Sequence, residues 1–260
     1  MPAYMHHRCR TCKGLHAILS GLVLALTVSV AAADGPPAFL VVQWEATAKR
    51  AQHPLVDLPA IVQASGGEVL AAADAHVVEV LEPGSPGRAT LLLRWPERSA
   101  LDAAWSEIAS ILPAEDEWLV LAVEGLPAEG LPPDATLPNV ANVPPIDGNA
   151  PVAYMLVQGS VTDAGAMPAY RALIQPMLVE RGAYYIVYAG AADVDVLRGV
   201  WGEHALIVSR WPDRERANEF WFSRVYQDEA IPARIKASRF TVLLLQQGCT
   251  GENKVHLCEP

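Results

Sequence analysis

Arg94-Trp95-Pro96-Glu97-Arg98 recurs 116 residues further on as Arg210-Trp211-Pro212-Asp213-Arg214, and this recurrence decides the fold. Other segments recur in the same order at an offset of 115 or 116 residues: 38–43 on 153–158, Gly66 on Gly182, 79–81 on 195–197, and Trp105 on Trp221. Matches that keep one order and a nearly constant offset indicate a tandem duplication. We therefore predict two repeats, over residues 34–125 and 152–248.

The second repeat shows its element order most clearly. Residues 153–157, 205–211 and 240–245 are apolar, β-prone runs, and 184–188 with 193–197 predict a hairpin around Gly190. One helix precedes Gly182, because its apolar side chains recur at helical spacing: Tyr170, Leu173, Ile174, Met177 and Leu178. A second helix starts after Pro212. The order is β-α-β-β-α-β, which is typical of the ferredoxin-like fold.

A ferredoxin-like sheet with helices on one face leaves its other face bare. Two repeats in one chain can bury that face by packing sheet to sheet. The predicted fold is therefore α+β, with two ferredoxin-like repeats packed sheet to sheet in one chain, and we expect a monomer in solution. Residues 126–151 contain seven prolines and predict a semi-rigid linker between the repeats.

The N-terminus has the layout of a secretory signal peptide over residues 1–33. Arg8, Arg10 and Lys13 precede an apolar run, and Ala31-Ala32-Ala33 supplies a small-residue cleavage site. We expect an exported protein, periplasmic or secreted, with no stable membrane association after cleavage. An uncleaved membrane anchor is the alternative, because the apolar run approaches spanning length.

Cleavage would remove Cys9 and Cys12 and leave Cys249 and Cys258 in a C-terminal tail, residues 249–260. In an oxidising compartment this pair predicts a disulfide. A metal site formed by both thiols and His256 lacks a fourth ligand, so we expect no metal.

The second repeat resembles the DUF1330 family of the dimeric α+β barrel superfamily. The residues that carry the resemblance are Ala153, Tyr154, Val161, Thr162, Asp163, Tyr170, Gly182, Leu197, Gly199, Trp201, Trp211, Pro212, Ala217, Trp221, Phe222, Ser223, Tyr226, Gln227 and Arg234. The chain departs from the family where Gly182-Ala183-Tyr184 replaces a usual Gly-Gly-Arg. The first repeat is a degenerate copy. The resemblance implies pairing of two such units and brings no established reaction.

Charge and motifs limit the classes of function that this sequence supports. The net charge of −10 argues against nucleic acid, and no phosphate-binding, dinucleotide or nucleophile motif predicts a cofactor or a reaction. The first repeat and linker, 34–148, hold 17 acidic and 5 basic residues, whereas 149–260 hold 12 and 11. A small anionic ligand should therefore prefer the second repeat. The alternative interpretation is a mixed, solvated surface on which acids neutralise these arginines.

We predict a ligand pocket between the sheet and helices of the second repeat. Its candidate residues are aromatic or cationic: Tyr154, Tyr170, Arg171, His204, Arg210, Trp211, Trp221, Tyr226 and Arg234. The competing interpretation is that these aromatic side chains are core packing. Two functions remain open: a non-catalytic module that binds a small molecule or serves as a scaffold, and, by analogy with the wider superfamily, a cofactor-independent monooxygenase or isomerase.

Overall fold

The computed structural model describes residues 35–45, 57–73, 79–82, 87–112, 118–146, 151–203, 205–247, 249–251 and 254–256. The predicted signal peptide, His204 and Cys258 lie outside the described residues, so the signal and disulfide predictions stay predictions. No helix in the described ranges is long and apolar enough to cross a membrane.

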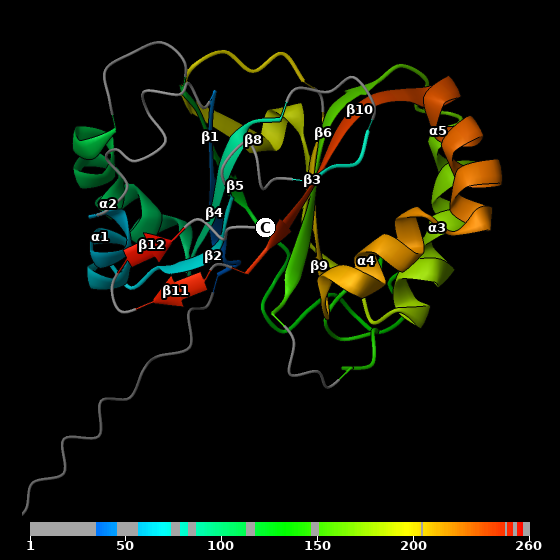
Figure 1. Ribbon diagram of the computed structural model, residues 1–260, viewed down its shortest axis with the longest axis horizontal. Coiled ribbons are helices and arrows are strands. Elements are labelled where there is room, and N and C mark those ends of the chain that lie inside the picture. Colours follow the sequence, from blue (N-terminus) through cyan, green and yellow to red (C-terminus); the bar gives the residue numbers. More distant parts are fainter. Residues whose placement is uncertain are drawn as a thin grey trace, which may run out of the picture. The chain divides into compact units, whose positions relative to one another are not determined.

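The first sheet contains the strands of the first repeat in the order β2-β4-β1-β5, followed by β8. Its strands are β1 (Ala38–Trp44), β2 (Glu68–Ala73), β4 (Ala89–Trp95), β5 (Trp118–Glu124) and β8 (Val194–Arg198). The helices α1 (Leu58–Ala64) and α2 (Arg98–Ile111) cover one face of this sheet (Figure 1). Every described pairing in the sheet is antiparallel.

The second sheet has the order β3-β10-β6-β9-β7. Its strands are β3 (Glu79–Val80), β6 (Ala153–Val161), β7 (Tyr184–Gly190), β9 (Ala205–Trp211) and β10 (Ser238–Gln246). Three helices cover its outer face: α3 (Met167–Glu180), α4 (Arg214–Trp221) and α5 (Ile231–Ala237) (Figure 1). A π-helical turn at Tyr226–Ala230 precedes α5, and a 3₁₀ turn at Ala191–Asp193 follows β7. Two short strands, β11 (Cys249–Gly251) and β12 (Lys254–His256), pair in the tail.

The α3 helix ends where the sequence predicts, at Gly182. This glycine has a φ of 70°, and the amide of Ala183 donates to the carbonyl of Leu178 at 2.9 Å. A residue with a left-handed backbone conformation often ends a helix, and glycine adopts this conformation at little energetic cost. The turn aims the chain into β7.

The two repeats exchange one short strand each. β8 follows β7 in the sequence but pairs with β5 of the first sheet, and β3 of the first repeat pairs with β10 of the second. The predicted hairpin of 184–188 with 193–197 is therefore wrong. The 3₁₀ turn at Ala191–Asp193 carries the chain across to the other sheet, where an open β5 edge offers backbone partners.

Equivalent ion pairs hold the exchanged strands. Arg98 on α2 contacts Asp195 on β8 at 2.6 Å, and Arg214 on α4 contacts Glu79 on β3 at 2.7 Å. Each pair joins residues from different repeats. These exposed pairs add little energy by themselves, but they orient the crossing segments.

Three apolar layers follow from the alternation of side chains along the strands. Along β1, Ala38, Leu40 and Val42 face α1 and α2, while Phe39 and Val41 face the second sheet. The layer between the sheets joins residues of both repeats, whereas a third layer lies under α3, α4 and α5. The structure confirms the predicted α+β fold of two ferredoxin-like units packed sheet to sheet.

The linker packs on the edge of the second sheet. Its Pro138 carbonyl accepts from the Tyr185 amide at 3.0 Å, and the Leu126 amide donates to the Ile186 carbonyl at 2.8 Å. Asn139 is completely buried. The linker therefore covers the edge strand β7, a role that the composition of the segment does not reveal.

Candidate functional site

The sequence-predicted site residues lie on two faces of the second sheet. Six of them line one small cavity beneath the helices: Tyr170, Arg171, Trp211, Trp221, Tyr226 and Arg234. Tyr154 and Arg210 line a different cavity, between the two sheets, because their strand positions alternate with those that face the helices. His204 lies outside the described residues.

The cavity beneath the helices is nearly filled by aromatic side chains. Its volume is only about 50 Å³. Phe220 bridges Trp211 and Tyr226 with ring centroids 5.0 Å and 4.5 Å apart, and Trp221 lies 4.8 Å from Tyr226. Ligand pockets usually measure about 300 Å³ or more. The aromatic side chains therefore act mainly as core packing here.

Arg234 is the charged member of this core. Its side chain is 2% exposed, forms an ion pair with Glu82 of the first repeat and lies 5.5 Å from the Trp221 ring. Burial raises the pKa of the neighbouring Tyr170 and Tyr226 hydroxyls, which therefore stay neutral. Since Glu82 comes from the other repeat, this arginine ties the two halves together.

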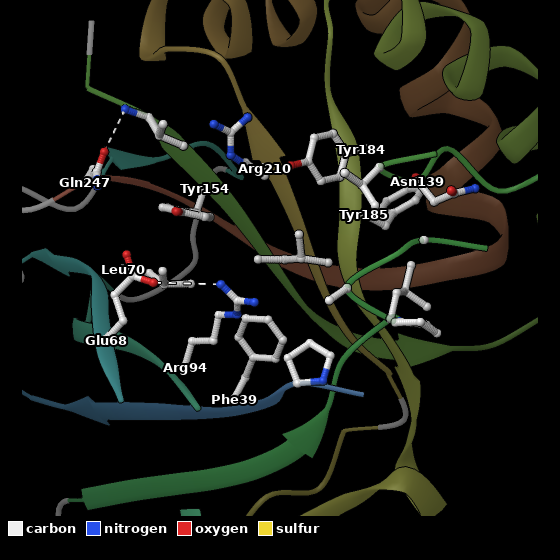
Figure 2. Close-up of a pocket in the computed structure, with 18 residues that line it drawn as sticks. Phe39, Glu68, Leu70, Arg94, Asn139, Tyr154, Tyr184, Tyr185, Arg210 and Gln247 are labelled. Carbon is white, nitrogen blue, oxygen red and sulfur yellow. Dashed lines mark hydrogen bonds and ion pairs between the residues drawn. The ribbon is translucent and has the colours of Figure 1, made fainter. Parts of the chain in front are cut away.

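The cavity between the sheets, here called the arginine cavity, has a volume of about 290 Å³ (Figure 2). Matching strand positions of both repeats line it. The first sheet contributes Phe39, Glu68, Leu70 and Arg94, and the second contributes Tyr154, Tyr184, Ile186 and Arg210. Figure 2 shows the side chains of Arg94, Tyr154 and Arg210 directed into this cavity.

The two arginines have different surroundings. Arg94 lies 3.8 Å from the carboxylate of Glu68, which is itself largely exposed. Arg210 lies 5.6 Å from the centre of the Tyr184 ring, and in the described part of the chain it has no carboxylate partner. A guanidinium held over an aromatic ring keeps its N–H donors free for an acceptor. The charged lining, with two arginines and one glutamate, is net positive.

Tyr154 supplies a neutral donor between the strands. Burial raises the pKa of its hydroxyl to about 12, and the nearby Arg210 guanidinium partly opposes this shift. The phenol therefore stays protonated at any physiological pH. Its side chain is 5% exposed, and none of the described groups accepts a hydrogen bond from its hydroxyl.

The linker and the end of β10 form the rim of the arginine cavity. The side-chain oxygen of Asn139 accepts from the amides of Leu131 at 3.1 Å and Ala141 at 2.9 Å. Gln247 accepts from the Val152 amide at 3.4 Å. Sequence reasoning missed these residues and also Arg94, although the recurrence of Arg94 at Arg210 was a signal that could have found the arginine pair.

Within the described ranges, no three His, Cys, Asp or Glu side chains group together in a way that could hold a metal ion. What the arginine cavity offers is cationic and phenolic donors above apolar side chains. That combination suits an anionic head group attached to an apolar body.

Comparison with known proteins finds a family model that matches the second repeat. Residues 152–248 match the model of the family "Domain of unknown function (DUF1330)", as the sequence predicts. A search of curated proteins found no match.

The solved structures that align with this chain have low sequence identity. A proposed monooxygenase from Fusobacterium nucleatum aligns with a TM-score of 0.47 and 9% identity, covering 84% of this chain and 97% of that one. A mutant chlorite dismutase from Candidatus Nitrospira defluvii aligns with a TM-score of 0.48 and 10% identity, covering 82% and 92%.

Proposed function

We propose that this chain, whose residues 152–248 match DUF1330, is a non-catalytic module that binds a small organic anion in the arginine cavity. The observation that carries the proposal is the pairing of Arg94 with Arg210 around one cavity of about 290 Å³. Among the described residues only Arg94 has a carboxylate beside it, so a positive charge remains for a ligand.

The ligand chemistry follows from the lining. Arg210 and the Tyr154 hydroxyl supply donors for a carboxylate or a similar head group, which a planar guanidinium binds well. Phe39, Leu70 and Ile186 supply apolar contact for the rest of the molecule. An aromatic carboxylate such as benzoate combines both features and serves as the probe.

A binding role fits the interior better than catalysis does. A cofactor-independent enzyme needs an acid or a base that faces an enclosed cavity. The cavity beneath the helices is instead closed by ring packing around one ion-paired arginine, and its tyrosines stay neutral. In the lining of the arginine cavity, Glu68 supplies a carboxylate, but it is largely exposed and lies beside Arg94 as a counter-charge. We propose further that the protein acts as a monomer outside the cytoplasm, after removal of residues 1–33.

Calorimetric titration with benzoate tests the proposal. Replacing Arg210 with Gln should weaken benzoate binding about tenfold or more, since a charge-assisted hydrogen bond contributes about 1.5–3 kcal/mol. Arg224→Gln is the matched control, because it removes the same charge from a side chain that is 94% exposed. Native mass spectrometry of protein purified from its source should show a co-purified anion. Equal affinity of the Arg210→Gln variant and the wild type would reject the proposal.

A further inference from the structure

A second cavity lies between the sheets, at the opposite ends of β1 and β6 from the arginine cavity. Its volume is about 290 Å³, and it is here called the glutamine cavity. The residues that line it are Gln43, Arg88, Leu119, Gln158, Val200, Trp201, Gly202, Glu203, Thr241 and Leu243. Phe39 and Gln43 lie four residues apart on β1, so about 13 Å of strand separates the two cavities. The apolar layer that includes Val41 and Leu156 fills the space between them.

The two glutamines hold equivalent strand positions but have different partners. Gln43 lies opposite Thr90 on β4, and its side-chain amide donates to the Thr90 hydroxyl at 3.4 Å. Gln158 lies between Leu206 on β9, which offers no acceptor, and Thr241 on β10. The Gln158 side chain is 8% exposed and its amide nitrogen has no hydrogen-bond partner among the described residues. The second repeat therefore leaves a buried amide free at this position.

Two further buried donors that lack a partner among the described residues belong to side chains that line the same cavity. They are the Nε of Arg88 and the indole Nε1 of Trp201. Three of the six unpaired buried side-chain atoms in the described ranges thus belong to one cavity. Native proteins leave few such groups, and a cluster of them needs an explanation. All three can donate a hydrogen bond, so the complementary ligand is one that accepts.

The charges of the glutamine cavity balance. Arg88 lies 3.8 Å from Glu45, and Glu203 accepts a hydrogen bond from Ser160 at 2.9 Å. One arginine and one glutamate line the cavity, so there is no excess charge to attract an ion. This distinguishes the glutamine cavity from the arginine cavity.

We propose that the glutamine cavity is a second binding site, for a small uncharged molecule whose carbonyl-type oxygen accepts hydrogen bonds from Gln158, Arg88 and Trp201. Leu119 and Leu243 contact the apolar part of that molecule. The site is independent of anion binding, since the two cavities share no lining residue.

Nicotinamide, an uncharged aromatic amide, tests this site by nitrogen-15 NMR of the tryptophan indole groups. The Trp201 resonance, assigned with a Trp201→Phe variant, should shift on titration. The indoles of Trp95 and Trp211 donate to Ser65 and Ser209, each at 3.0 Å, so their resonances should stay in place. Benzene, which lacks the carbonyl, and nicotinate, which carries a charge, should each produce less than a tenth of the shift at equal concentration.

Gln158→Leu should weaken nicotinamide binding about tenfold. Gln227→Leu is the matched control and should retain the affinity, because Gln227 lines neither cavity and its side-chain amide donates to the Trp221 carbonyl. Arg88→Met provides a second test at a less buried position if Gln158→Leu fails to fold. An unmoved Trp201 resonance, or equal affinity of the Gln158→Leu protein, would overturn the proposal, and a matching shift with benzene would show that only the apolar surface binds.

Discussion

Replacing Leu156 with Ala tests whether the two repeats fold as one unit. Leu156 on β6 is 1% exposed and belongs to the apolar layer that both sheets share. The substitution removes three buried carbon atoms, about 2.4 kcal/mol of transfer free energy, and leaves a cavity that raises the loss further. We expect the free energy of unfolding to fall by about 3–4 kcal/mol. Because the layer is common, the first repeat should lose as much stability as the second.

Urea unfolding, followed through the indole resonances of Trp95 in the first repeat and Trp211 in the second, measures this. Both side chains are fully buried, each in the outer core of its own repeat. Both signals should disappear in one transition, which Leu156→Ala moves to lower urea. Val179→Ala, on a side chain that is 36% exposed, is the control and should change stability by about 0.5 kcal/mol or less. A Trp95 transition that the Leu156 substitution leaves unmoved would refute a common core.

Three further predictions concern charge and processing. Burial raises the pKa of Tyr154 from 10.0 to about 12. The stabilising contribution of the neutral phenol is therefore complete below pH 10 and is lost as the pH rises toward 12, with a slope of up to about 1.4 kcal/mol per pH unit. Tyr154→Phe should remove this pH dependence from unfolding free energies measured across that range. Glu82→Gln should lower the free energy of unfolding by about 3 kcal/mol, because it leaves Arg234 buried without its counter-charge. Glu79→Gln breaks a more exposed ion pair and should lower the free energy of unfolding by about 1 kcal/mol or less, measured by the same urea denaturation. Intact-mass measurement of protein from its source should give a chain that begins at residue 34 and has no free thiol before reduction; a full-length mass or two free thiols would contradict export or the disulfide.

The sequence predicts most of the fold because the repeat and the alternation of apolar residues can both be recognised in the sequence itself. It predicts the βαββαβ order and the sheet-to-sheet packing, and it places residues 79–81 and 195–197 in matching positions. It does not predict the strand exchange. Both short strands are β-prone in either pairing, and only the open edges of β5 and β10, which form in three dimensions, select the partner.

The sequence suggests the residue types of the candidate site better than it predicts where in the fold the site lies. Tyr154 and Arg210 are among the residues that the sequence suggests, but a shift of one position along a strand decides which face a side chain occupies. Arg94 and the linker residue Asn139 come to the arginine cavity through the packing of the sheets. Both residues lie more than 50 positions from Arg210 in the sequence, so no local sequence pattern indicates that they line the same cavity.

The benzoate affinities of the wild type, Arg210→Gln and Arg224→Gln decide whether the arginine cavity is an anion site. We expect the Arg210 variant to bind benzoate at least about tenfold more weakly, while the Arg224 variant binds like the wild type. The same affinity in all three proteins would contradict an anion site in the arginine cavity.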